Sequence, residues 1–254
     1  MDVRPMFLFY KDLRHSYMIA KQLGANHVKC VYSTCYSCQL LQLRFLGSNF
    51  IDISREECFT LSQRYRMFWE SEKLASRLPF PNTEKIKVGF VSSDFRTHSV
   101  PYFVRGLLRN YNKSKFEIHL YANTTTADLD HVSREFQNYT DRWHDITKLT
   151  YSQIADLVKS EEISVLIDLQ GHTRGHRLKT FGFRPAPLQI TYLGYPNTTG
   201  LKSFDYRISD NISEPEDAQD FHSEKLYKID GCFCVIRLML LFRIAVLMIC
   251  KTAK

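Results

Sequence analysis

Residues 163–169 read Ile-Ser-Val-Leu-Ile-Asp-Leu, a nearly continuous run of apolar side chains. A half-buried strand alternates apolar with polar residues, whereas a strand that is covered on both faces is apolar almost throughout. The run therefore predicts a central strand of a sheet that carries helices on both sides. Asp168 lies inside the run and needs partners if it is buried, so it either has a functional role or fixes a loop.

The sequence on both sides of this run alternates between strand-like and helix-like patterns. Further strands are predicted at 85–91, 116–121, 188–193 and 206–209, and helices at 100–109, 128–139 and 151–159. Strands separated by helical stretches of about 10–15 residues are typical of βαβ units. The sequence therefore predicts an α/β domain over residues 85–229, built on a mainly parallel sheet with flanking helices.

A segment with a different pattern of apolar and polar residues precedes this domain. Residues 1–81 are predicted to form a helical lead-in, with helices at 12–23 and 54–78. Pro79 and Pro81 end the second helix, because proline removes a backbone donor and restricts the residue before it.

An apolar tail, residues 230–254, follows the domain. Its stretch from Phe233 to Cys250 is close to the length that spans a bilayer. Arg237 and Arg243 lie inside this stretch, where a charge is costly. Three alternatives stay open for the tail: a transmembrane helix, a buried helix or strand, and an altered end without an evolved role.

The composition narrows the class of protein and its compartment. The chain has 254 residues, of which 44% are apolar, and a formal net charge of +7. Phosphorylated or polyanionic ligands suit this charge, but the chain lacks the Lys/Arg runs of nucleic-acid-binding arms, so no specific nucleic-acid partner is predicted. Seven cysteines without a framework spacing, and a first stretch unlike a secretory signal, predict a cytoplasmic location, with the nucleus as the alternative.

The first of three polar loops, Ser-Ser-Asp-Phe-Arg-Thr-His-Ser at 92–99, follows the predicted strand 85–91. In an open parallel sheet, ligands bind at the carboxyl ends of strands, where loops lead into helices. With Ser99 as the predicted N-cap, His98 is expected at a helix start, where free N–H groups favour a phosphate. A neutral histidine can accept a proton or donate a hydrogen bond, so His98 is the candidate catalytic residue, with a plain surface position as the alternative. Asp94 is a candidate substrate-binding residue that can equally well cap a turn.

The second polar loop, Gly-His-Thr-Arg-Gly-His-Arg at 171–177, directly follows the central strand. Gly171 permits close backbone approach, while His172 and Thr173 offer hydrogen-bonding groups for hydroxyls or phosphates. All three are therefore candidate substrate-binding residues. His172 and His176 have i, i+4 spacing, but no carboxylate motif accompanies them, so no metal site is predicted.

The third polar loop, Gly-Tyr-Pro-Asn-Thr-Thr-Gly at 194–200, follows the predicted strand 188–193. Its hydroxyl and amide groups suit the recognition of sugar hydroxyls, and an ordinary turn is the alternative. The candidate substrate-binding residues in this loop are Tyr195, Pro196, Asn197 and Thr198.

A series of motifs containing these loops occurs in a characteristic order. The motifs are KVGFVSSDFRTHSVPYF, FEIHLYAN, DRWHDI, ISVLIDLQGHTRGHRL, FRPAPLQITYLGYPNTTG, DYRISD and HSEKLY. Together they resemble the amino-terminal half of the catalytic region of the O-GlcNAc transferase and SPINDLY family, glycosyltransferase family 41. The resemblance covers the chain from about Lys85 to Tyr227.

The resemblance implies that residues 85–229 are a Rossmann-like lobe, one of two lobes whose cleft holds the active site. It also implies that residues 1–81 correspond to the segment joining TPR repeats to the catalytic region. The implied reaction transfers GlcNAc from UDP-GlcNAc to Ser or Thr of intracellular proteins with inversion, and it needs neither a metal nor another cofactor. His98 matches the family's active-site histidine, and the segments 171–173 and 195–198 match regions that line the same cleft.

The sequence leaves the family pattern near Asp230, and nothing in it matches the second lobe, whose lysine neutralises the donor diphosphate in the family. Losing such electrostatic stabilisation removes a large catalytic contribution. Three functions therefore stay open: a protein O-GlcNAc transferase present as a partial catalytic region, an inactive fragment or binding module, and a SPINDLY-type protein O-fucosyltransferase. The expected partners are a nucleotide sugar, acceptor proteins and the missing carboxyl-terminal lobe, and only the stretch 233–250 suggests a membrane.

Overall fold

The structure is a computed structural model. It describes residues 75–232 together with positions 56, 59–60, 62–63, 66 and 70. The chain divides into two compact units, Met1–Asp52 and Ile53–Lys254, and the first lies wholly outside the described residues. The predicted helix at 12–23 and the apolar stretch 233–250 also lie outside them, so these two features and the predicted domain division stay predictions. Within the described residues, no helix combines the length and the apolarity that crossing a bilayer requires.

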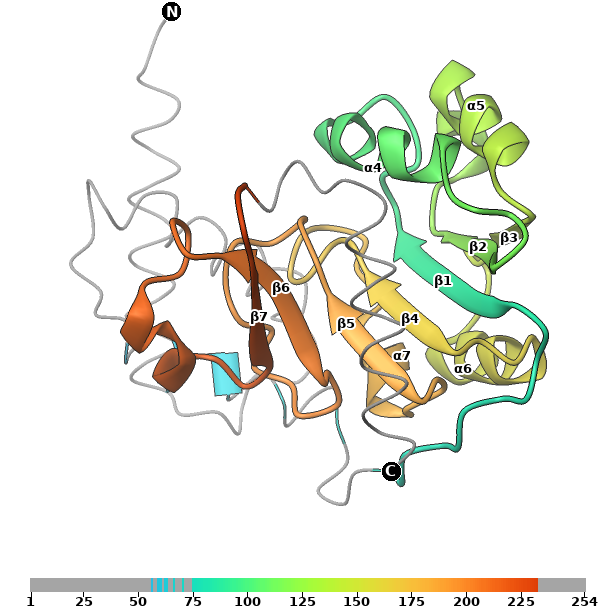
Figure 1. The fold of residues 1–254 in the computed structure, drawn as a ribbon. Coiled ribbons are helices and arrows are strands. Elements are labelled where there is room, and N and C mark those ends of the chain that lie inside the picture. The colour runs from blue at the N-terminus through green and yellow to red at the C-terminus, as the bar shows by residue number, and fades with distance from the viewer. Residues whose placement is uncertain are drawn as a thin grey trace, which may run out of the picture. The chain divides into compact units, whose positions relative to one another are not determined.

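A seven-stranded sheet forms the centre of the described part (Figure 1). Its strands are β1 (Ile86–Ser92), β2 (Phe116–Ala122), β3 (Arg142–Asp145), β4 (Val165–Asp168), β5 (Leu188–Thr191), β6 (Tyr206–Asp210) and β7 (Lys225–Ile229). The strand order is β3-β2-β1-β4-β5-β6-β7, and each neighbouring pair is parallel. The predicted α/β fold with a mainly parallel sheet is confirmed.

Helices cover both faces of this sheet. They are α4 (Ser99–Arg109), α5 (His131–Tyr139), α6 (Tyr151–Ser160) and α7 (Leu178–Gly182), with 3₁₀ turns η2 (Thr126–Asp128) and η3 (Glu216–Phe221). α4 contacts α5 and α6 contacts α7, and Figure 1 shows the first pair above the sheet and the second pair below it. From β1 the chain forms β2 and β3 on one side of β1, and it then returns to form β4 on the other side. Because parallel crossovers are right-handed, this change of direction places the two pairs of helices on opposite faces of the sheet.

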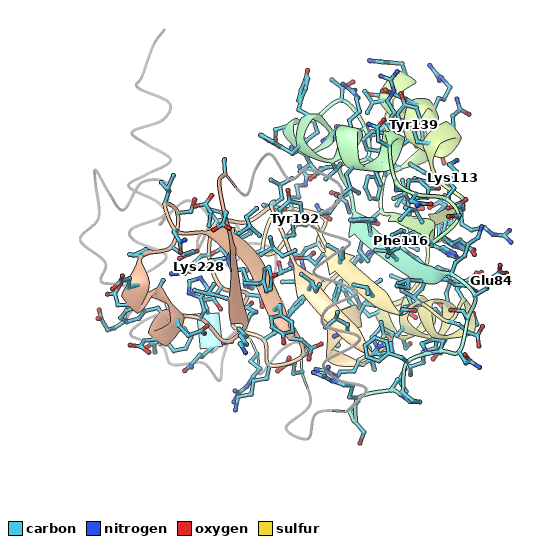
Figure 2. The ribbon with its side chains drawn as sticks, viewed as in Figure 1. Glu84, Lys113, Phe116, Tyr139, Tyr192 and Lys228 are labelled. Carbon is cyan, nitrogen blue, oxygen red and sulfur yellow. The ribbon has the colours of Figure 1, made fainter. Side chains whose placement is uncertain are left out.

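The core follows from the apolar strands. β4 is buried along its whole length, as the run at 163–169 predicts. Phe90, Leu120 and Ile167, from three neighbouring strands, belong to one buried apolar cluster. Figure 2 labels two members of this cluster, Phe116 on β2 and Tyr192 just after β5. Burial of such side chains contributes roughly 1.5–3 kcal/mol each, which makes the sheet a firm support for its loops.

Two strands and one α-helix of the described part were absent from the sequence-based prediction, namely β3, β7 and α7, as were the two 3₁₀ turns. β3 reads Arg-Trp-His-Asp and lies at an edge of the sheet, so it lacks the apolar pattern of a central strand. β7 forms the opposite edge and is only partly buried. α7 has five residues, too few to show a helical periodicity.

Several element boundaries also differ from the predicted ones. The N-cap of α4 is His98 rather than Ser99, because the His98 side chain accepts a hydrogen bond from the Val100 N–H. α5 begins at His131 and not at residue 128, since Asp130 caps it through a capping box with Ser133. β5 ends at Thr191 and not at residue 193, because the backbone turns there and gives Leu193 a φ of 68°.

The predicted helix at 54–78 is correct in type but too long. The described positions 56, 59–60, 62–63 and 66 are helical, whereas residues 75–80 are not. Proline disfavours helical backbone in the residue before it, so Pro79 restricts Leu78. At the described positions, however, helical backbone extends to Arg66 and Glu70 is already a bend, so the helix ends before Glu70.

Candidate functional site

The three polar loops lie at the carboxyl ends of β1, β4 and β5, which are neighbours in the sheet. The strand order reverses between β1 and β4, since β1 is followed outward by β2 and the chain later returns to β1's other side. Ligands of open parallel sheets bind at such a switch point, where the loops of the two halves diverge. The fold thus brings together the loops that the sequence singled out.

Gln170 joins the first loop to the second. The Ser93 N–H donates to Gln170 Oε1 at 2.8 Å, and Gln170 Nε2 donates to Ser93 Oγ at 2.5 Å. Gln170 Nε2 also donates to the Arg174 carbonyl at 3.0 Å. Gln170 is buried, so this buried amide fixes the spacing of the two loops. Sequence reasoning did not single it out, although its place directly after a buried strand is a usable signal.

His98 lies exposed at the start of α4. Its Nδ1 accepts from the Val100 N–H at 3.4 Å and lies 3.7 Å from Asp94 Oδ2. The side chain of His98 is 41% exposed, whereas that of Asp94 is 10% exposed. Because Nδ1 acts as an acceptor, a neutral ring carries its proton on Nε2. No hydrogen bond from the described residues engages Nε2, so the ring presents an N–H group outward.

Asp168 fixes the second loop at the end of β4. Its carboxyl accepts from the Gly171 N–H at 2.7 Å, the Gln170 N–H at 3.2 Å and the Thr191 hydroxyl at 3.0 Å. Burial raises the pKa of Asp168 to about 6, and these hydrogen bonds oppose the rise. Of the two roles open for Asp168, the geometry favours the fixing of a loop.

Gly171 and His172 pack against the third loop. Gly171 has a φ of 54°, and a Cβ at this position would lie 2.3 Å from the Tyr195 Cβ. His172 is buried, its ring meets Tyr195 edge-on at 5.1 Å, and its Nε2 lies 2.7 Å from the Thr199 carbonyl oxygen. Burial lowers the pKa of His172 to about 4, so this ring is neutral near pH 7. Only glycine, with no Cβ, permits this contact between the two loops.

Thr173 is the third candidate of the second loop. It is half-buried, and its hydroxyl donates to the Gln170 carbonyl at 3.0 Å. The hydroxyl oxygen keeps acceptor capacity for another partner.

Glu224 holds the third loop from within. Its Oε2 accepts from the Thr198 hydroxyl at 2.6 Å, and its Oε1 accepts from the Thr199 N–H at 2.7 Å. Asn197 Oδ1 accepts from the Thr198 N–H at 2.8 Å. Glu224 and both threonines are buried. The Glu224 carboxylate therefore accepts the hydrogen bonds of the Thr198 hydroxyl and the Thr199 N–H, which would otherwise be buried without an acceptor.

Arg207, on β6, supports the same loop from below. Its Nη1 donates to the carbonyls of Tyr195 and Asn197, both at 2.9 Å. Its charge lies 3.5 Å from the Glu214 carboxylate, and both side chains are almost fully buried. Sequence reasoning missed Arg207 and Glu224, yet an arginine inside an apolar strand is itself a signal, because a buried charge needs partners.

The candidate residues differ in how they meet solvent. His98 and Pro196 are exposed and Thr173 is half-buried, whereas Asp94, Gly171, His172, Tyr195, Asn197 and Thr198 are buried. The structure thus places the candidates in one region while it engages most of their polar groups internally. Their catalytic and substrate-binding roles stay predictions. One exposed aromatic side chain, Tyr102 on α4, follows His98 by one helical turn and was not among the candidates.

A parallel α/β lobe with polar loops at its switch point is the class of domain that binds nucleotide-containing ligands. The family model "Glycosyl transferase family 41" matches residues 66–248. The chain therefore belongs to glycosyl transferase family 41, as its motifs predict. The matched residues continue past Asp230 into the apolar tail.

Two curated plant relatives carry the same name, probable UDP-N-acetylglucosamine–peptide N-acetylglucosaminyltransferase SPINDLY. The protein of Oryza sativa subsp. japonica is 34% identical over 169 residues, which cover 65% of this chain and 17% of that protein. The protein of Arabidopsis thaliana is 37% identical over 152 residues, which cover 58% of this chain and 16% of that protein. The chain thus spans a small part of the length of the relatives it matches.

An animal relative agrees with this assignment, and a solved structure shares the fold. The UDP-N-acetylglucosamine–peptide N-acetylglucosaminyltransferase of Caenorhabditis elegans is 29% identical over 162 residues, 63% of this chain and 14% of that protein. A mutant of the Thermobaculum terrenum O-GlcNAc transferase superposes with a TM-score of 0.75 at 24% identity, over 88% of this chain and 41% of that chain. The superposition supports the Rossmann-like fold of the lobe.

Proposed function

We propose that the chain is part of the catalytic region of a protein O-GlcNAc transferase, which moves GlcNAc from UDP-GlcNAc to Ser or Thr of acceptor proteins. The observation that carries the proposal is the exposed His98 at the first turn of α4, beside the β1–β4 switch point. Membership of glycosyl transferase family 41 and the names of the relatives support the donor and the acceptor class. The cysteine pattern supports a reducing compartment, the cytoplasm or the nucleus.

The reaction joins an acceptor hydroxyl oxygen to the anomeric carbon of the sugar, while the hydroxyl loses its proton and UDP leaves. A group that helps this step must lie within hydrogen-bond reach of the sugar, the acceptor or the phosphate. In the observed geometry Nδ1 of His98 is occupied by the Val100 N–H, so Nε2 is a donor. We therefore assign to His98 a hydrogen bond from Nε2–H to an oxygen of the donor sugar or its phosphate.

Asp94 and the start of α4 complete this half of the site in the proposal. The Asp94 carboxylate limits the orientation of the His98 ring from 3.7 Å away. At the start of α4 the Val100 N–H already donates to His98 and Pro101 has no N–H, so the Ser99 N–H and the partial positive charge of the helix start are left to attract an anion. A second lobe supplies the remaining diphosphate contacts, and it is the protein partner that the proposal requires.

Incubation of the purified chain, together with a separately produced carboxyl-terminal catalytic lobe of a family 41 relative, with UDP-GlcNAc and Ser/Thr acceptor peptides tests the activity, with mass spectrometry as the readout. The expected product carries one N-acetylhexosamine on a Ser or Thr side chain. A parallel reaction with GDP-fucose separates the alternatives, because fucose on the peptide would identify a SPINDLY-type O-fucosyltransferase instead. Binding of UDP-GlcNAc without transfer to any peptide would contradict the proposal and leave a binding module.

Two substitutions at one position test the role of His98. His98→Ala removes both nitrogens and is expected to lower the transfer rate by about 10²–10⁴-fold. His98→Gln keeps an N–H donor but cannot take up a proton, so it is expected to retain more activity than His98→Ala. If both variants are equally impaired, His98 acts as a base and not as a donor. The exposed His131→Ala variant is the control and is expected to keep the full rate.

A further inference from the structure

A second group of polar side chains lies at the end of α6, and Figure 1 shows α6 on the opposite side of the sheet from α4. It contains His119 on β2, His144 on β3 and Glu161, which is the C-cap of α6. Tyr121 pairs with His144 across the two strands, and residues 119 and 121 share one face of β2. Three separate elements therefore deliver these side chains to one place.

The three side chains are spaced as ligands of one metal ion are spaced. His119 Nδ1 lies 3.2 Å from His144 Nε2 and 3.8 Å from Glu161 Oε2. All three ligand atoms lie within 4.8 Å of one another. Two nitrogens bound to a tetrahedral Zn²⁺ at their usual bond length lie roughly 3.3 Å apart. Small side-chain movements thus suffice to bring the three atoms to a common ion.

A further carboxylate orients the buried histidine. Glu117 Oε1 accepts from His119 Nε2 at 2.8 Å, while the His119 side chain has no exposed surface. With its proton on Nε2, the ring directs the lone pair of Nδ1 toward His144 and Glu161. Histidine ligands of zinc usually donate their second N–H to a carboxylate in this way, which fixes the tautomer.

A direct hydrogen bond from His144 Nε2–H to His119 Nδ1 would satisfy the two rings without an ion. Two observations favour the ion. The Glu161 carboxylate approaches the same nitrogen, although a hydrogen-bonded pair of histidines has no need of it. The Tyr121 ring stacks on His144 at 4.7 Å, and among the described residues its buried hydroxyl meets no hydrogen-bond partner. A water on the ion's open position is a suitable partner for such a hydroxyl.

We propose that His119, His144 and Glu161 bind one divalent transition-metal ion of the zinc type, which ties β2, β3 and α6 together. Two histidines and one carboxylate form a donor set that Zn²⁺ accepts, with a water as the fourth ligand. His144 and Glu161 are half-buried, so the ion enters from solvent on their side. The ion stabilises an edge of the sheet where the short strand β3 has only one strand neighbour, and it takes no part in sugar transfer.

Equilibrium dialysis of the chain against Zn²⁺ tests this site, with the thiols alkylated first because the chain has seven cysteines. The wild type is expected to bind one Zn²⁺ more than His144→Gln and Glu161→Gln. Glu117→Gln is expected to weaken this binding by about 10–100-fold, since the orienting carboxylate is lost. His131→Gln and Glu162→Gln are matched controls with exposed side chains, and they are expected to bind as the wild type does.

A second readout guards against misfolded variants. Far-UV circular dichroism without metal is expected to be the same for the wild type, His144→Gln and both controls. Zn²⁺ is then expected to raise the unfolding temperature of the wild type and the controls, but not that of His144→Gln. Equal Zn²⁺ binding by the wild type and a correctly folded His144→Gln would overturn the proposal, and so would an alkylated wild type that binds no Zn²⁺.

Discussion

The loop at 92–99 and the loop at 194–200 both follow strands of one sheet, yet the polar side chains of the two loops differ in their exposure to solvent. The first exposes Thr97, His98 and Ser99 to solvent at the start of α4. The second buries Thr198 and Thr199 and bonds both to Glu224. A polar loop is therefore available to a ligand only where the protein itself does not supply partners for its polar groups.

The difference depends on residues that are distant in sequence. Glu224 and Arg207 reach the third loop from the segments around β7 and β6, and both are buried there. Within the described part of the chain, no comparable buried partner covers His98, whose side chain is 41% exposed. We call the buried residues that hold the second and third loops the packed side, and the loop at 92–99 with His98 the exposed side. Substitutions on the packed side are thus expected to alter stability, whereas substitutions on the exposed side are expected to alter activity.

Gly171→Ala is expected to have the largest effect on stability. The new Cβ would lie 2.3 Å from the Tyr195 Cβ, and the residue would keep a φ of 54°. Overpacking and left-handed strain together lower the free energy of unfolding by about 4 kcal/mol. Urea denaturation measures the change. Gly106→Ala is the control, because nothing lies within 4 Å of its Cβ on α4 and a gain in stability of up to about 1 kcal/mol is expected.

The pH dependence of stability tests the burial of His172. Its pKa is about 4 in the folded protein against an ordinary value of 6.5, because burial disfavours the charged ring. The unfolded chain therefore binds more protons between these two pH values, and stability falls as the pH drops from 6.5 to 4, on the order of 3 kcal/mol from this group.

Asp168 acts in the opposite direction over part of this range. Its folded pKa of about 6 lies above the ordinary 3.8, so the folded state binds the extra proton there and gains stability as the pH falls. Comparing urea denaturation of His172→Asn with the wild type at pH 7 and pH 4.5 isolates the histidine. A pH dependence equal in both proteins would show that His172 is accessible to protons, and exposed His131→Gln is the control.

Glu224→Gln is expected to have a smaller effect on the same side. The amide keeps one acceptor oxygen, but it loses the charge that receives the Thr198 hydroxyl and the Thr199 N–H. The free energy of unfolding is expected to fall by about 2 kcal/mol, as for other hydrogen bonds to charged groups. Thermal unfolding measures the loss, and exposed Glu216→Gln is expected to stay within about 0.5 kcal/mol of the wild type. A Glu224→Gln protein as stable as the control would mean that the third loop is not held from within.

His98→Ala is expected to have the smallest effect on stability. Among the described residues, the His98 side chain accepts the 3.4 Å cap bond from the Val100 N–H and lies 3.7 Å from the Asp94 carboxylate. The free energy of unfolding is expected to change by less than about 0.5 kcal/mol, although transfer activity falls steeply. Thermal unfolding of the purified variant measures this. A large loss of stability would place His98 on the packed side. The loss of activity in this variant could then result from unfolding and would no longer indicate a role of His98 in the reaction.

Much of the fold could be predicted from the sequence because strand and helix periodicities are local. The apolar run 163–169 correctly indicates a buried central strand, and the alternating elements around it correctly indicate a parallel α/β sheet. β3 and β7 were not predicted, because edge strands need not be apolar on both faces and therefore lack a clear sequence pattern. The N-cap was misplaced by one residue because a histidine at that position competes with the more usual serine.

The sequence by itself determined the central strands and main helices, the family and the three loops, since each depends on neighbouring residues or on an ordered set of motifs. Only the tertiary structure decided which polar groups face outward. Gln170, Arg207 and Glu224 join segments that the sequence keeps apart, and they settle whether a hydroxyl or an imidazole is already bonded inside the protein. A buried polar group must find its partner in space, and strand order rather than sequence distance sets which partners lie within reach.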